Sequence, residues 1–194
     1  MIKGGMMLVF LALLNSVIAL YLYILASRVW MQKCRVNYWN PVVQFVVRVT
    51  DPLVKPARRL IPGYKGVDFA VIFVIYIFQV ALLLTVLPFV EVSLSWWSLA
   101  FLALFKAILL VLNFAMYLVI LAAVFSWLRP RNPGPFFQLV GELSQPALRR
   151  VRSFVPIVRG LDFSPLVLLL VIQLLKFIFI WGGAIIASSL GWVA

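Results

Sequence analysis

The residues that most often carry chemistry in proteins are scarce in this sequence and lie far apart. The chain has no histidine, one cysteine (Cys34) and five acidic residues among 194. Zinc and haem sites usually need several Cys or His ligands, and a lone thiol cannot form a disulfide within its own chain. No two carboxylates lie close in sequence, so no acid–base pair or metal triad is visible. We predict no catalytic residues, no metal and no cofactor, and expect a protein that is not an enzyme.

Four polar side chains within long apolar runs are the remaining candidates: Gln79, Lys106, Gln173 and Lys176. A lysine inside a membrane is by default a functional-site hypothesis, whereas amides there usually bond neighbouring helices. For the lysines, two interpretations stay open: outward snorkelling of the long stem, or pairing with Glu91. For the amides, the alternative to helix–helix bonds is a conducting path that they line.

The composition explains why these side chains matter. Hydrophobic residues make up 65% of the chain and charged residues 11%, and the mean hydropathy is +1.14. Soluble domains average about 45–50% apolar and about 25% charged residues. The formal net charge is +12, which favours an anionic membrane surface. No recognised nucleic-acid motif is present, so we expect no nucleic-acid partner.

Four apolar runs are long enough to cross a bilayer core of about 30 Å. They span about 6–26, 69–90, 98–127 and 163–190. Eight basic residues lie in the connection after the first run and six in the connection after the third. Because basic loops stay on the cytoplasmic side, we predict a multi-pass membrane protein with both long loops cytoplasmic and both termini outside.

The two long connections are copies of each other. A shift of 94 residues aligns 41–79 with 135–173 without a gap, and ten of the 39 pairs are identical. The matched pairs include Arg58/Arg152, Asp68/Asp162 and Gln79/Gln173. We therefore predict two parallel repeats, 1–94 and 95–194, each a helix, a basic loop and a helix. The fold class is an all-α membrane protein with four transmembrane helices and short interfacial amphipathic helices.

Each basic connection is predicted to form interfacial helices, at about 41–61 and 135–155. Asn40-Pro41 suits a helix start, and Asp51-Pro52 predicts a break into two short helices. The basic residues of these segments form the predicted lipid or partner surface: Lys55, Arg58, Arg59, Arg149, Arg150 and Arg152. The open alternatives are a specific site for an anionic lipid or acidic partner, and simple electrostatic anchoring to the inner leaflet.

Asp68 and Asp162 directly precede the second and fourth spans. An aspartate there can cap exposed N–H groups and meets the positive end of the helix. We predict that both are helix caps, with a proton relay as the alternative. In the fourth span, Gly183, Ala187 and Gly191 recur at intervals of four, a spacing that permits close helix approach.

The repeated pattern with Asp51-Pro52, Arg58, Pro62, Gly66 and Asp68, and its second copy ending at 165, resembles the YggT (YlmG) family. The resemblance covers nearly the whole chain. It implies a non-enzymatic accessory, assembly or scaffolding protein of the bacterial inner (plasma) membrane, linked in the family to osmotic tolerance, cell division, nucleoid organisation and cytochrome assembly. A membrane-protein partner or a homo-oligomer is expected. The alternative is an oligomeric transporter or channel for ions or osmolytes.

Overall fold

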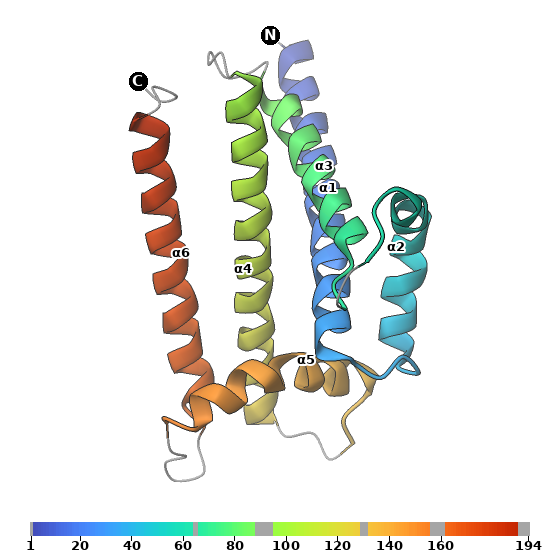
Figure 1. Ribbon diagram of the computed structural model, residues 1–194, viewed down its shortest axis with the longest axis vertical. Helices are drawn as coiled ribbons and strands as arrows, with labels where there is room; N and C mark the ends of the chain where they lie inside the picture. Colours follow the sequence, from blue (N-terminus) through green and yellow to red (C-terminus); the bar gives the residue numbers. More distant parts are fainter. Residues whose placement is uncertain (1, 64–65, 88–94, 129–131, 156–161, 190–194) are drawn as a thin grey trace.

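The computed structural model describes residues 2–63, 66–87, 95–128, 132–155 and 162–189, and these residues form helices without any strand (Figure 1). The helices, in chain order, are α1 (Ile2–Cys34), α2 (Pro41–Leu60), α3 (Phe69–Val86), α4 (Trp96–Leu128), α5 (Pro135–Arg152) and α6 (Ser164–Ser189). The predicted all-helical architecture is therefore confirmed for the described part of the chain.

Four of these helices are long and apolar enough to cross a membrane, as the sequence predicts. The qualifying stretches are Val9–Cys34, Phe69–Val86, Trp96–Leu128 and Ser164–Ile185. The first ends eight residues later than the predicted limit at residue 26. A polar side chain does not by itself end a helix unless it bonds the backbone in place of the helical hydrogen bonds. α1 therefore continues through Arg28 and Lys33 to Cys34. Arg35, directly after it, takes a left-handed conformation with φ of 51°, as is common after the last residue of a helix.

The other two helices, α2 and α5, are the connections that carry the basic residues. Figure 1 shows α5 crosswise at the end of the bundle where α4 ends and α6 begins, while α2 packs beside α1 and α3. On α2 the buried side chains recur at helical spacing: Val43, Val46, Thr50, Val54 and Ala57. On α5 they are Leu139, Val140, Leu143, Ser144 and Leu148. Each connecting helix thus buries one face and exposes the other.

The predicted division of 41–61 into two short helices is wrong. α2 runs without interruption from Pro41 to Leu60 and contains Pro52 and Pro56. Its axis changes direction midway in Figure 1. Proline lacks the N–H for one helical hydrogen bond and crowds the preceding turn, which usually kinks or breaks a helix. Here a kink suffices, because the packing of α2 on its neighbours holds both halves.

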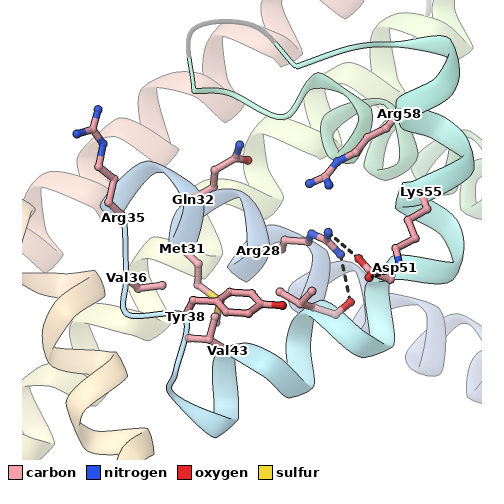
Figure 2. Close-up of a pocket in the computed structure, with 11 residues that line it drawn as sticks. Arg28, Met31, Gln32, Arg35, Val36, Tyr38, Val43, Asp51, Lys55 and Arg58 are labelled. Carbon is pink, nitrogen blue, oxygen red and sulfur yellow. Dashed lines mark hydrogen bonds and ion pairs between the residues drawn. The ribbon is translucent and has the colours of Figure 1, made fainter.

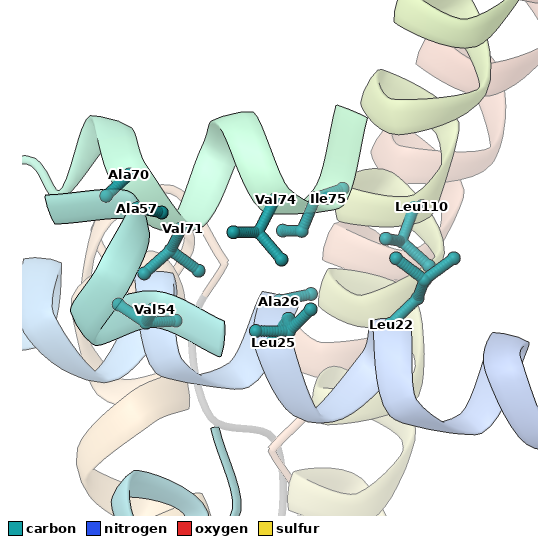
Figure 3. Close-up of a cluster of buried hydrophobic side chains, with 10 residues drawn as sticks. All are labelled: Leu22, Leu25, Ala26, Val54, Ala57, Ala70, Val71, Val74, Ile75 and Leu110. Carbon is teal, nitrogen blue, oxygen red and sulfur yellow. The ribbon is translucent and has the colours of Figure 1, made fainter. Parts of the chain in front are cut away.

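The largest cluster of buried apolar side chains among the described residues lies between α1, α2 and α3, with a contribution from α4. Figure 3 shows side chains of α2 and α3 pointing toward α1, and Leu110 of α4 closing one end. Val54, Val71 and Ala70 are fully buried there, because small and β-branched side chains let three helices approach closely. Two further clusters join α4 to α3 and α5 to α1 and α2.

α6 packs on α4 and α5 and leaves most of its surface exposed. At the α4–α6 contact, a Cβ on Gly183 would lie 2.4 Å from the ring of Phe105, which itself stacks on Phe179 at 4.2 Å between centroids. Glycine at 183 therefore allows α4 and α6 to approach closely. The side chain of Ala187, and Gly191, fall outside the described residues.

Candidate functional site

A buried polar network joins α1 to the middle of α2. The Arg28 side chain is 8% exposed, and its guanidinium forms an ion pair with Asp51 at 2.8 Å. It also donates to the Thr50 hydroxyl and to the Val47 carbonyl oxygen, the latter at 3.3 Å. Lys55, one turn after Asp51 on α2, donates to the other carboxylate oxygen at 2.9 Å. One carboxylate thus holds a buried arginine and an exposed lysine.

Side chains of α1 donate to carbonyl oxygens of α2 close to its bend. Pro52 lacks the N–H that would otherwise bond the Arg48 carbonyl oxygen, and a distorted helix can tilt neighbouring carbonyls outward. The Val47 oxygen accepts from Arg28, and the Val49 oxygen accepts from the Tyr21 hydroxyl at 3.3 Å. These two bonds tie the kinked segment of α2 to α1.

The charge of Asp51 is stabilised by its neighbours. Burial acts to raise its pKa, but hydrogen bonds from Lys55 and Arg28, together with their positive charges, outweigh that effect and leave the pKa below its ordinary value. Asp51 is therefore ionised in the folded protein near neutral pH.

Two further ion pairs occupy equivalent positions in the repeated segments. Arg58 Nε donates to Asp68 at 2.8 Å, and Arg152 Nε donates to Asp162 at 2.8 Å; in each pair a terminal guanidinium nitrogen contacts the same oxygen. Each pair fastens the last turn of a connecting helix to the residue before a span. We refer to them as the two Arg–Asp clamps. Their aspartates are nearly buried, with side-chain exposures of 2% and 11%.

The clamps change the interpretation of both aspartates. Asp68 occupies the N-cap position of α3, but its side chain makes no capping hydrogen bond, so the predicted cap is wrong there. Its Oδ2 binds Arg58, and its Oδ1 has no partner among the described residues. Asp162 does accept the Ser164 N–H at 2.9 Å, as expected of a cap, while its other oxygen binds Arg152.

The environment of Asp162 also lowers its pKa. Burial again acts in the opposite direction, but hydrogen bonds from Ser164 and Arg152, and the positive charge of Arg152, keep the pKa below its ordinary value. The carboxylate therefore stabilises the fold in its ionised form.

Of the six residues predicted to form the lipid or partner surface, two are committed to the clamps, Lys55 pairs with Asp51, and the other three are exposed and form no ion pair with any described residue. Lys55 has 71% of its side chain exposed, and Arg59, Arg149 and Arg150 are also exposed. Arg58 and Arg152 remain 46% and 35% exposed but hold aspartates. The structural role of this arginine pair was not anticipated. The signal available in the sequence was an aspartate ten residues after the arginine in both copies, 58 to 68 and 152 to 162.

A cavity of about 410 Å³ lies between the end of α1 and α2. Figure 2 shows Arg28 and Asp51 at its inner side, with Lys55 and Arg58 above them and Arg35 on the opposite rim. Gln32 and Tyr38 also line the cavity, together with four apolar side chains: Met31, Val36, Val43 and Val47. We call it the α1–α2 cavity.

The two connecting helices are also joined to each other. The Asn40 amide donates to the Pro135 carbonyl oxygen at 2.8 Å, and the backbone N–H of Asn37 donates to Glu142 at 3.1 Å. The indole of Trp30 on α1 donates to the Leu143 carbonyl oxygen at 3.1 Å. These contacts join the start of α2, and the loop before it, to α5 at the end of α1.

The four polar side chains predicted within the spans are not gathered in one place. Gln79 is 6% exposed on α3, whereas Gln173 is exposed on α6. In the described part of the chain α3 and α6 make no contact, and α4 lies between them (Figure 1). Lys176 is half-buried with its Nζ 3.8 Å from the sulfur of Met116. A path lined by all four residues would therefore need more than one copy of the chain.

Some predicted contacts remain without a structural test. Lys106 is exposed on α4, and its proposed partner Glu91 lies outside the described residues. An unforeseen polar contact links the spans instead: the Thr85 hydroxyl of α3 donates to Asn15 Oδ1 of α1 at 3.1 Å. Among the described residues, no three acidic, histidine or cysteine side chains gather in a group that could hold a metal ion.

Comparison with known proteins gives consistent matches. The family described as CCB3/YggT matches residues 7–96 and 101–182. The chain is 34% identical over 167 residues to the uncharacterized protein YggT of Escherichia coli (strain K12), covering 84% of this chain and 85% of the relative. It is 33% identical over 176 residues to the uncharacterized protein PA0392 of Pseudomonas aeruginosa, covering 87% and 86%. No solved structure matches significantly.

Proposed function

The chain belongs to the CCB3/YggT family, as the sequence resemblance predicts, and from that premise we propose a non-enzymatic accessory or scaffolding role in the bacterial inner membrane. Four membrane-spanning helices hold α2 and α5 against one leaflet. The exposed cations of these helices then form a docking surface for the anionic lipid of that leaflet and for an acidic face of a membrane-protein partner.

The observation that carries this proposal is the joint presentation of cations by α2 and α5. Both helices bury an apolar face in the bundle, contact each other, and expose Lys55, Arg59, Arg149 and Arg150. Each basic residue near an anionic leaflet contributes about 1 kcal/mol at physiological salt. The clamps support the role because they fix the orientation of both helices relative to the spans.

The cytoplasmic placement of this surface follows from the positive-inside rule. Of the 17 basic residues, 14 lie in the two connections, eight in the first and six in the second. The two copies with their clamps also support two parallel repeats as the origin of the surface. The partner belongs to one of the processes linked to the family, which include osmotic tolerance, cell division and cytochrome assembly.

Crosslinking in cells tests the proposal. A photoreactive residue placed at exposed Glu142 captures neighbours of the surface, in the parent chain and in a variant with Arg59→Gln, Arg149→Gln and Arg150→Gln. The clamp arginines are left unchanged because their loss would leave two nearly buried aspartates without an ion-pair partner. We expect loss of the crosslinked partner with unchanged membrane insertion.

The matched control is Lys106→Gln, which removes an exposed cation from α4, away from the proposed surface. It should leave the crosslinked partner in place. Recovery of the same neighbours from the triple variant, at the same yield as from the parent chain, would remove the basis for a docking role.

A further inference from the structure

The α1–α2 cavity combines a cationic rim with an apolar floor. Its volume of about 410 Å³ falls in the range of roughly 300–1,000 Å³ typical of ligand pockets. Met31 and Val43 supply part of the floor, while Lys55 and Arg58 stand on the rim (Figure 2). A lining of this kind suits a ligand with a charged group joined to an apolar body.

The charges around the cavity do not cancel. Four cations line it: Arg28, Arg35, Lys55 and Arg58. Two carboxylates engage them, Asp51 with Arg28 and Lys55, and Asp68 with Arg58. Four positive and two negative charges leave a net +2 at the cavity. A phosphodiester anion would reduce this excess and would lie against donors rather than acceptors.

The inner cation is held in position before any ligand arrives. Arg28 is 8% exposed, and Asp51, Thr50 and the Val47 carbonyl fix its guanidinium. A guanidinium has five N–H donors, of which these contacts use three. Lys55, by contrast, is 71% exposed and can reorient toward a ligand at little cost. The cavity thus joins a fixed arginine to a mobile lysine.

The second repeated segment does not reproduce this arrangement. The position 94 residues after Asp51 holds Gln145, so a neutral amide replaces the carboxylate of the buried ion pair there. The hollow beside Arg149 on α5 is lined by Arg35, Glu142 and Gln145 among others, so two arginines share that lining with a carboxylate. The chemistry therefore distinguishes one specific site in the first segment from general basic surface in the second.

We infer that the α1–α2 cavity binds the phosphodiester headgroup of one anionic glycerophospholipid, such as phosphatidylglycerol. Basic pockets at the cytoplasmic ends of membrane-spanning helices commonly bind such headgroups. The cavity opens beside the last turn of α1, and its apolar floor accommodates the glycerol and first methylenes. This inference rests on the proposed placement of α2 at the headgroup level, and it adds a fixed stoichiometry of one lipid per chain.

Lipid retention by the purified full-length protein tests the site. The protein in neutral detergent is titrated with phosphatidylglycerol, with zwitterionic phosphatidylcholine, and with soluble glycerophosphoglycerol, and bound lipids are counted by native mass spectrometry. The test variant carries Arg35→Gln and Lys55→Gln. The matched control carries Lys33→Gln and Arg48→Gln, which remove the same charge from exposed side chains that do not line the cavity. All four side chains are exposed, so both variants should fold like the parent chain.

We expect one phosphatidylglycerol per chain, with affinity about fivefold weaker for each cavity cation removed and nearly unchanged in the control. An equal loss of affinity for phosphatidylglycerol in both variants would mean that lipid binding depends only on total surface charge, and it would overturn the inference. Binding of soluble glycerophosphoglycerol as tightly as the lipid would also overturn it, because the site would then be a free-anion site.

The design separates this inference from the proposed docking function. A purified protein that binds no lipid specifically, while the triple variant still loses its partner in cells, refutes the cavity site alone. Specific lipid binding without any partner at the surface refutes the docking function alone.

Discussion

The buried pair of Arg28 and Asp51 can be tested sharply because the second copy holds a neutral residue, Gln145, at the position equivalent to Asp51. We predict that Arg28→Ala and Asp51→Gln each destabilise the protein. The double variant should cost far less than the sum of the two single changes, because it leaves no buried charge unpaired.

The structure sets the magnitudes. Removing one partner of a fully buried ion pair costs about 3–5 kcal/mol. Asp51 is 21% exposed and Arg28 keeps two neutral acceptors, so we expect about 2–3 kcal/mol for Asp51→Gln. Arg28→Ala should cost about 2 kcal/mol, mainly from lost packing of its stem, because Lys55 still neutralises the carboxylate. The sum is about 4–5 kcal/mol, whereas the double variant should cost about 2–3 kcal/mol.

The assay is reversible unfolding in mixed micelles with increasing denaturing detergent, followed by circular dichroism. Lys55→Gln is the control, and it should change the free energy of unfolding by no more than about 0.5 kcal/mol because that side chain is largely exposed. Additivity of the two single changes to within about 0.5 kcal/mol would refute the reasoning, since it would mean that the two groups are not coupled.

Three other predictions concern the clamps and the α4–α6 contact. Arg58→Gln should destabilise by about 3 kcal/mol and Asp68→Asn by about 1 kcal/mol, because the aspartate is buried and the arginine can turn to water; equal losses in the same unfolding assay would contradict this. Folding lowers the pKa of Asp162, so its contribution to the free energy of unfolding is complete above the ordinary carboxyl pKa of about 3.9 and is lost as pH falls through the lower folded-state value. Asp162→Asn should therefore weaken the fall of the free energy of unfolding at acid pH. An unchanged fall in that variant would count against the clamp. Gly183→Ala should lower stability by about 1–2 kcal/mol while Gly182→Ala changes little, because only the former meets an aromatic ring of α4; similar melting temperatures for the two variants would argue against close packing there.

Hydropathy and periodicity predicted the helices well because both depend on local composition. The four spans and the two helical connections follow from apolar runs, proline positions and basic residues. The end of α1 was placed too early because hydropathy falls at Arg28. The helix continues there, and Arg28 is buried because it pairs with Asp51. The kink at Pro52 was predicted as a break, since sequence does not reveal the packing that holds both halves of α2.

The polar contacts were less predictable because they depend on which helices meet. Asp68 was expected to cap α3, yet the bend of α2 brings Arg58 to it. Arg28 and Asp51 are 23 residues apart and have no local pattern. The replacement of Asp51 by Gln145 in the second copy was the one sequence signal, and its meaning depends on knowing that Asp51 contacts Arg28.

The central claim is that the two basic connecting helices face the same, cytoplasmic side of the membrane. Single cysteines at Arg59 and Arg149, introduced into a chain with Cys34→Ala, can be labelled with a membrane-impermeant maleimide in right-side-out and inverted vesicles. Both positions should react in inverted vesicles and remain unlabelled in right-side-out ones. Labelling of the two positions from opposite sides of the membrane would contradict the account.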